Sequence, residues 1–121
     1  MLELKPDMKH KQVEEFILSM PNSKLEYPFG EEVAVYKVND KMFALVSENK
    51  KPVNVSLKCD PTLAEALRDK YESVMPGYHL SKKHWNTIVL SGQLPWEDIK
   101  ALIKHSYLLV TGTSSELPII D

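Results

Sequence analysis

The residues best suited to chemistry in this 121-residue chain are histidines and lysines placed close to a tryptophan, namely His79, Lys82, Lys83, His84 and Trp85. They lie within residues 73–96, a segment that contains no Asp or Glu. Lysine ammonium groups neutralise phosphates and release counterions, and an aromatic ring can stack on a base or wedge beside it. The cluster therefore predicts contacts with nucleic acid. The structural alternative is that both lysines form a solvated turn while the tryptophan anchors the core.

A second acid-free segment, residues 49–59, contributes Lys50, Lys51 and Lys58. We predict that Lys50 and Lys51 lie in a polar loop, and that Lys58 ends a strand from which it could reach an anion on an open sheet face. A lysine at such a position can equally lay its aliphatic stem on apolar surface and keep its charge in water. Both explanations stay open for Lys58, whereas the structural one is favoured for Lys41.

Cys59 and the two histidines, His79 and His84, are the candidates for metal binding or catalysis. Two histidines without a nearby carboxylate or a second cysteine make a poor zinc site. A small buried cysteine at a strand end is more common than a nucleophile with a lowered pKa. Gly-rich phosphate loops and the G-x-S-x-G and H-E-x-x-H sequences are absent. We expect no catalytic residue, no metal ligand and no cofactor, so the chain is interpreted as a binding module and not as an enzyme.

Composition and length are those of one soluble globular domain, with 43% apolar and 26% charged residues. The single cysteine excludes an internal disulfide, and the first residues lack the apolar run of a signal peptide. The net charge is −2, yet residues 37–84 carry nine Lys or Arg against six Asp or Glu. We expect a cytoplasmic protein without a membrane segment that presents a basic face although it is acidic overall.

Hydrophobic periodicity predicts eight elements in the order α-β-β-β-α-β-β-α. The helices are expected to start near Asp7, Asp60-Pro61 and Pro95, and the strands at residues 32–38, 41–46, 53–58, 74–80 and 85–90. Such an order implies an α+β fold, with an antiparallel five-stranded sheet and its helices packed on one face. Residues 1–112 would form this single domain, residues 113–121 a loose C-terminal tail, and the uncovered sheet face a place for a partner.

Residues 52–110 closely resemble the MmcQ/YjbR family, and the upstream segment YPFGEEVAVYKVNDKMFALV is similar to its N-terminal half. The most specific parts are Lys41-Met42-Phe43, Leu57-Lys58-Cys59 and the run YHLSKKHW at residues 78–85. The resemblance implies a two-layer fold related to CyaY/frataxin-like and secretion-chaperone-like domains. It also implies DNA binding in a double-wing mode, and one founding member belongs to a mitomycin-resistance setting.

The first functional hypothesis is a DNA-binding module whose partner is double-stranded DNA. Lys50 and Lys51 would lie on one loop-wing and Lys82 and Lys83 on another, with Lys58, His79, His84 and Trp85 completing the contact set. Binding would be mainly electrostatic, because no predicted helix carries the Arg, Asn and Gln pattern that reads base edges in the major groove.

The second hypothesis, from a different class, is a domain that binds a small planar ligand or a protein on the open sheet face, with a possible role in drug resistance. An aromatic recess would be formed there by Phe29, Tyr36, Phe43, Tyr78 and Trp85. We expect a monomer or weak dimer; a chaperone-like dimer follows from fold analogy alone.

Overall fold

The computed structural model describes residues 6–48, 52–77, 80–113 and 116–120. Along the described chain the elements are α1 (Pro6–Leu18), β1 (Lys24–Glu26), β2 (Val33–Val38), β3 (Lys41–Ser47), β4 (Asn54–Lys58), α2 (Pro61–Lys70), β5 (Val74–Pro76), β6 (Trp85–Val89) and α3 (Trp96–Thr111). No helix within the described ranges is long and apolar enough to cross a membrane.

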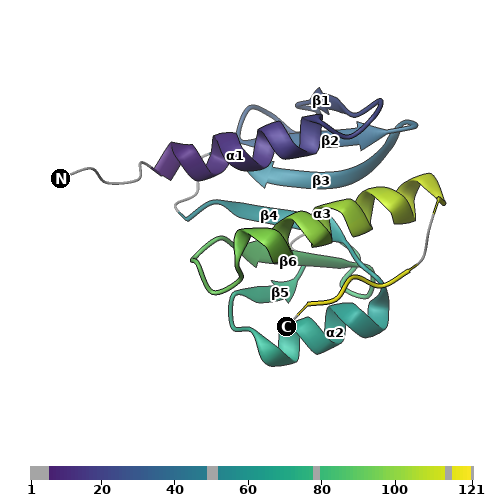
Figure 1. The fold of residues 1–121 in the computed structure, drawn as a ribbon. Coiled ribbons are helices and arrows are strands. Elements are labelled where there is room, and N and C mark those ends of the chain that lie inside the picture. The colour runs from purple at the N-terminus through teal and green to yellow at the C-terminus, as the bar shows by residue number, and fades with distance from the viewer. Residues whose placement is uncertain (1–5, 49–51, 78–79, 114–115, 121) are drawn as a thin grey trace.

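The strands form one antiparallel sheet in the order β1-β2-β3-β4-β6-β5, and the helices lie on one face of it (Figure 1). This arrangement confirms the predicted two-layer α+β fold. The predicted number of five strands is wrong, because β1 adds a sixth by pairing with β2. A three-residue strand is too short to show the alternation on which a prediction from periodicity depends.

Local sequence signals begin and end several elements as predicted. Asn39 and Asp40 adopt φ values of 52° and 63° in the turn between β2 and β3, which Asn and Asp tolerate better than most residues. The Asp60 carboxylate caps α2 by accepting hydrogen bonds from two backbone N–H groups. Gly112 ends α3 in the left-handed conformation, with φ 71°.

The register of the strands decides which side chains reach the core. Ala44 pairs with Leu57 and Val46 with Val55, and all four are buried beneath the helices. Their neighbours along the strands point to the opposite face because side chains alternate. α3 lies against β2, β3 and β4, α2 lies against β5 and β6, and α1 packs on α3.

The predicted aromatic recess on the open face is wrong for Tyr36 and Phe43, which are fully buried. Tyr36 pairs with Ala44 and Lys37 with Met42, so Phe43 is an extra residue on β3. A bulge of this kind turns the extra side chain away from strict alternation. The Phe43 ring accordingly packs edge-on against Tyr107 of α3, at 5.4 Å between ring centroids.

The described part of the C-terminal tail runs back along the helical layer toward α2 (Figure 1). Ile120 packs against the core, whereas Ile119 is 91% exposed. Ile120 therefore helps to hold the described part of the tail against the domain.

Candidate functional site

The antiparallel register brings lysines from separate strands to one end of the sheet. β2 ends there with Lys37 near its last residue, and β3 begins there with Lys41. β4 ends there with Lys58, whose cross-strand partner on β6 is Trp85. Two further lysines lie in the turn before Trp85. We call this set the basic end: Lys37, Lys41, Lys58, Lys82 and Lys83.

The opposite end of the sheet carries acidic residues. Glu31 and Glu32 precede β2, Glu48 follows β3 and Glu72 precedes β5. The backbone N–H of Glu48 donates to the carbonyl of Glu32 at 2.8 Å, which fixes two of these segments side by side. Among the described residues, these glutamates and the five lysines thus lie at opposite ends of the strands, although Asp40 and Asp60 flank the lysines, and a protein of net charge −2 presents a cluster of lysines at one end.

Most of the lysines at the basic end keep their charge available. Lys37 Nζ lies 3.1 Å from Glu26 Oε1. Within the described part of the chain, the other four form no ion pair. Lys41, Lys82 and Lys83 are exposed and Lys58 is half-buried. Unpaired ammonium groups on a surface attract anions without first breaking an existing interaction.

The carboxylate nearest to Lys58 in the sequence, that of Asp60, accepts hydrogen bonds from the backbone. Asp60 Oδ2 accepts hydrogen bonds from the N–H groups of Thr62 and Leu63, at 3.0 and 3.1 Å. Its negative charge thus lies against the positive end of the α2 dipole. Asp60 therefore stabilises the helix start and forms no ion pair with Lys58.

Trp85 holds the lysine turn in place and is only 8% exposed. The backbone N–H groups of His84 and Trp85 both donate to the carbonyl of Ser81, at 3.2 and 2.9 Å. Arg68 Nη1 donates to the carbonyl of Lys82 at 2.7 Å and ties the turn to α2. Because the ring of Trp85 is buried, we assign it a positioning role. His84, in contrast, is exposed at the surface.

Close packing at Gly77 supports this role of Trp85. The N–H of Gly77 donates to the carbonyl of Trp85 at 2.9 Å. A Cβ on Gly77 would lie 2.7 Å from the Cβ of Trp85, closer than such atoms approach. Only glycine permits the chain to cross Trp85 at this distance.

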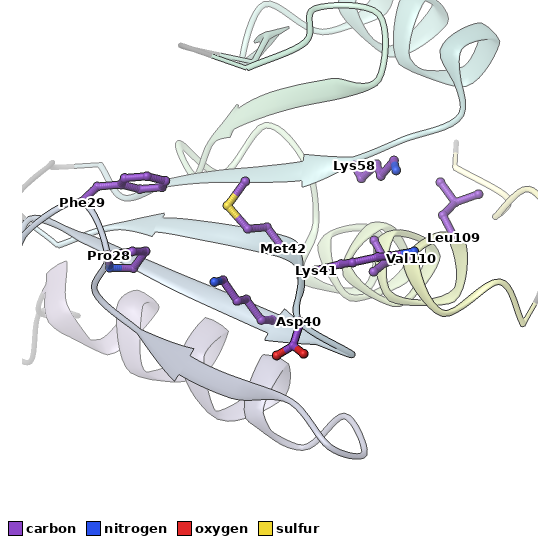
Figure 2. A pocket seen from close by; sticks show the side chains of 9 residues that line it. Pro28, Phe29, Asp40, Lys41, Met42, Lys58, Leu109 and Val110 are labelled. Carbon is purple, nitrogen blue, oxygen red and sulfur yellow. The ribbon is translucent and has the colours of Figure 1, made fainter.

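A pocket of about 580 Å³ opens at the basic end (Figure 2). Its cationic lining comes from Lys37, Lys41 and Lys58, and its apolar lining includes Phe29 and Met42. In Figure 2, Met42 lies between Phe29 and Lys58, and the side chains of Lys41 and Lys58 extend toward the end of α3. The pocket thus joins an anion-attracting side to an apolar side.

The structure brings together some of the residues predicted from the sequence. Lys58, Lys82, Lys83 and His84 lie at the same end of the sheet. Lys50, Lys51 and His79 lie outside the described residues. The candidate site is therefore built without the predicted Lys50–Lys51 wing.

Sequence reasoning missed Lys37 and favoured a structural role for Lys41, although both line the pocket. Alternation could have placed Lys37 on the open face, since its neighbours Tyr36 and Val38 are apolar. It could not have shown that Met42 and Lys58 reach the same pocket. That proximity depends on the pairing of β3 with β4.

Cys59 and His105 are buried groups near this end that can titrate. Cys59 is 4% exposed, and burial raises the pKa of its thiol to about 12. His105, which the sequence did not single out, accepts a hydrogen bond on Nε2 from the backbone N–H of Asp60 at 3.1 Å. Burial lowers the pKa of His105. Among the described residues, no three His, Cys, Asp or Glu side chains are arranged to hold a metal.

Comparison with known proteins places the chain among relatives of undefined activity. A family model described as YjbR matches residues 18–109. The chain is 46% identical over 71 residues to YjbR of Escherichia coli K12, covering 59% of this chain and 60% of that protein. It is 34% identical over 101 residues to YbdF of Escherichia coli O157:H7, covering 84% of this chain and 83% of YbdF. Both relatives are described as uncharacterized.

The fold is also that of a solved structure. The crystal structure of the Deinococcus radiodurans protein DR2400, a DUF419 domain, matches with a TM-score of 0.83 at 34% identity and covers 97% of both chains. The match to YjbR spans less than two thirds of that relative's length, whereas the match to YbdF spans most of it. With a family model covering most of its length and a relative above 30% identity, this chain belongs to the YjbR family.

Proposed function

We propose that this protein is a DNA-binding module that holds phosphates of double-stranded DNA at the basic end of its sheet. The observation that carries the proposal is the convergence of lysines from β2, β3, β4 and the turn before β6, four of them without an ion pair within the described residues. Lysines that neutralise phosphates release condensed counterions, and this release supplies most of the affinity of non-specific binding.

The contact surface has two adjoining parts. Lys58 lies directly across the β4–β6 pair from Trp85, so the turn carrying Lys82 and Lys83 lies next to it. Cross-strand neighbours have Cβ atoms about 5 Å apart, well within the reach of lysine side chains. Lys41 extends the surface toward the end of α3. Several consecutive phosphates can therefore be contacted at once.

Sequence preference should be weak. The contacts come from a sheet end and a turn, not from a helix that could lie in the major groove. Phosphate contacts fix the position of a protein on DNA but carry no base information.

Binding, and not catalysis, is the activity that we propose. A thiol acts as a nucleophile in its thiolate form, and burial raises the pKa of Cys59 to about 12, far from neutrality. This environment suits a packing role for the only cysteine in the chain. Cys59 lies within the hydrophobic core cluster.

The test is fluorescence anisotropy with a labelled duplex between about 50 mM and about 200 mM salt. Four lysines that each neutralise one phosphate predict a slope of log K against log salt of about −3.6. Lys82→Ala/Lys83→Ala should halve that slope and weaken binding. Lys100→Ala/Lys104→Ala removes the same charge from α3, on the helical layer, and should leave the slope unchanged. Equal effects of the two double variants, or a flat salt response, would refute the proposal.

A further inference from the structure

We infer that the pocket at the basic end holds one unpaired nucleotide, with its phosphate at Lys41 and Lys58 and its base against Phe29 and Met42. This inference rests on the proposed function and deepens it, because it adds to phosphate binding a site for an unpaired base. The protein should prefer strands with an unpaired nucleotide to an uninterrupted duplex.

The size of the pocket fits a ligand of this kind. Its volume of about 580 Å³ falls within the roughly 300–1,000 Å³ of sites that take small molecules. A duplex keeps its bases stacked inside a convex rod, so it can offer only phosphates to this site. An unpaired nucleotide can turn its base into the pocket while its phosphate stays at the rim.

The base would meet Phe29, whose side chain is 64% exposed. A turn presents this residue: the N–H of Gly30 donates to the carbonyl of Tyr27 at 3.3 Å, and Gly30 adopts φ 101°, which favours glycine. Met42 lines the same pocket and offers a polarizable sulfur that contacts aromatic rings well. Every base has a flat face, so stacking on Phe29 needs no particular sequence.

The phosphate would meet Lys41 and Lys58. Lys37 is the third lysine of the pocket, but Glu26 already pairs with it at 3.1 Å. Asp40 is the carboxylate among the lining residues, and in Figure 2 it points away from Met42 and from both lysines. The two unpaired ammonium groups therefore set the charge of the site.

The end of α3 lies beside these lysines, and a helix C-terminus normally repels anions. Here the chain covers two carbonyl groups of the last turn, those of Leu108 and Leu109. The N–H of Gly112 donates to the carbonyl of Leu109 at 3.2 Å, and the N–H of Thr113 donates to the carbonyl of Leu108 at 3.1 Å. Capping of this kind satisfies carbonyl groups that would otherwise face the phosphate.

The experiment compares a labelled oligothymidine with a labelled duplex of the same length, by anisotropy at one salt concentration. Wild type should bind the single strand roughly tenfold more tightly than the duplex, as expected when one base stacks on an aromatic ring. Phe29→Ala should abolish this difference and leave duplex binding unchanged, and Phe29→Trp should preserve it. Met75→Ala removes another exposed apolar side chain, on β5, and should change neither affinity.

Competition distinguishes a free nucleotide from one within a strand. Displacement by thymidine monophosphate, but not by thymidine, assigns the pocket to free nucleotides as well, whereas displacement by oligothymidine alone assigns it to strands. Equal affinity for single strand and duplex, unaffected by Phe29→Ala, would overturn the inference and leave the proposed function standing. Loss of the single-strand preference in Met75→Ala would overturn it too. Failure to bind either nucleic acid would remove both.

Discussion

Lys37 and Lys58 both line the pocket at the basic end, but a carboxylate reaches only one of them within the described residues. Glu26 on β1 pairs with Lys37 on β2 at 3.1 Å, and both side chains are partly exposed. An ion pair of this kind contributes little to stability, so its main effect is on the charge that the surface presents.

Glu26→Gln should therefore strengthen DNA binding by releasing Lys37. One more neutralised phosphate would make the salt slope steeper by about 0.9. The matched control is Glu97→Gln, which frees Lys100 from an ion pair of 2.9 Å on α3 and should not change binding. Anisotropy titrations at several salt concentrations measure both slopes, and an equal change in the two variants would contradict this account of Lys37.

His105 predicts how stability depends on pH. Burial lowers its pKa below 6.5, although the Asp60 carboxylate and a backbone hydrogen bond at Glu116 act in the opposite direction. The unfolded chain then binds more protons than the folded one as the pH falls through 6.5. The stabilising contribution of neutral His105 is complete above that pH and is lost progressively below it.

His105→Gln keeps an acceptor for the N–H of Asp60 but cannot be protonated. Its unfolding free energy should fall less than that of wild type when the pH is lowered from about 7.5 to about 5.5. Urea denaturation at a series of pH values measures the difference. Parallel curves for the two proteins would show that His105 does not titrate between those limits.

At the scale of elements, the start of α2 is the clearest case of a sequence signal that the structure uses. Asp60→Ala removes an acceptor for two backbone N–H groups and should lower the unfolding free energy by about 1 kcal/mol. Asp69→Ala, at an exposed position of the same helix, should change it by less than about 0.5 kcal/mol. Chemical denaturation monitored by circular dichroism distinguishes them, and equal losses would argue against a capping role.

Sequence reasoning succeeded where one short segment carries the whole signal. The turn at Asn39-Asp40, the cap at Asp60 and the end of α3 at Gly112 depend on local conformational preferences. Sequence reasoning failed where the conformation of a segment depends on an adjacent strand. β1 exists because β2 offers it an edge, and Phe43 turns to the helices because of a bulge.

The candidate site also has a part that the sequence could predict and a part that it could not. Lys58, Lys82 and Lys83 could be selected from acid-free segments, since charge patterning is visible in one dimension. The pocket could not, because Phe29, Met42 and Lys58 come from separate segments that only the sheet order brings together. The sequence made Trp85 a candidate contact with DNA. Its burial depends on the close packing of the Gly77 backbone against it, which no residue spacing in the sequence reveals.

For the whole molecule, the separation of charge along the sheet is the feature on which the proposed function depends. The basic end and the acidic end belong to the same strands, so the orientation of a bound polyanion is determined by the fold. A folded domain with net charge −2 can bind DNA only if the contact excludes its acidic end.

The most direct test is therefore to map the DNA contact surface by titrating isotope-labelled protein with an unlabelled duplex at low salt and following backbone amide signals. If DNA binds at the basic end, signals of Lys41, Lys58 and the turn before Trp85 shift together, and signals of Glu32 and Glu48 stay unchanged. Shifts centred on the acidic end or on the helical layer, or no shifts at low salt, would contradict DNA binding at the basic end.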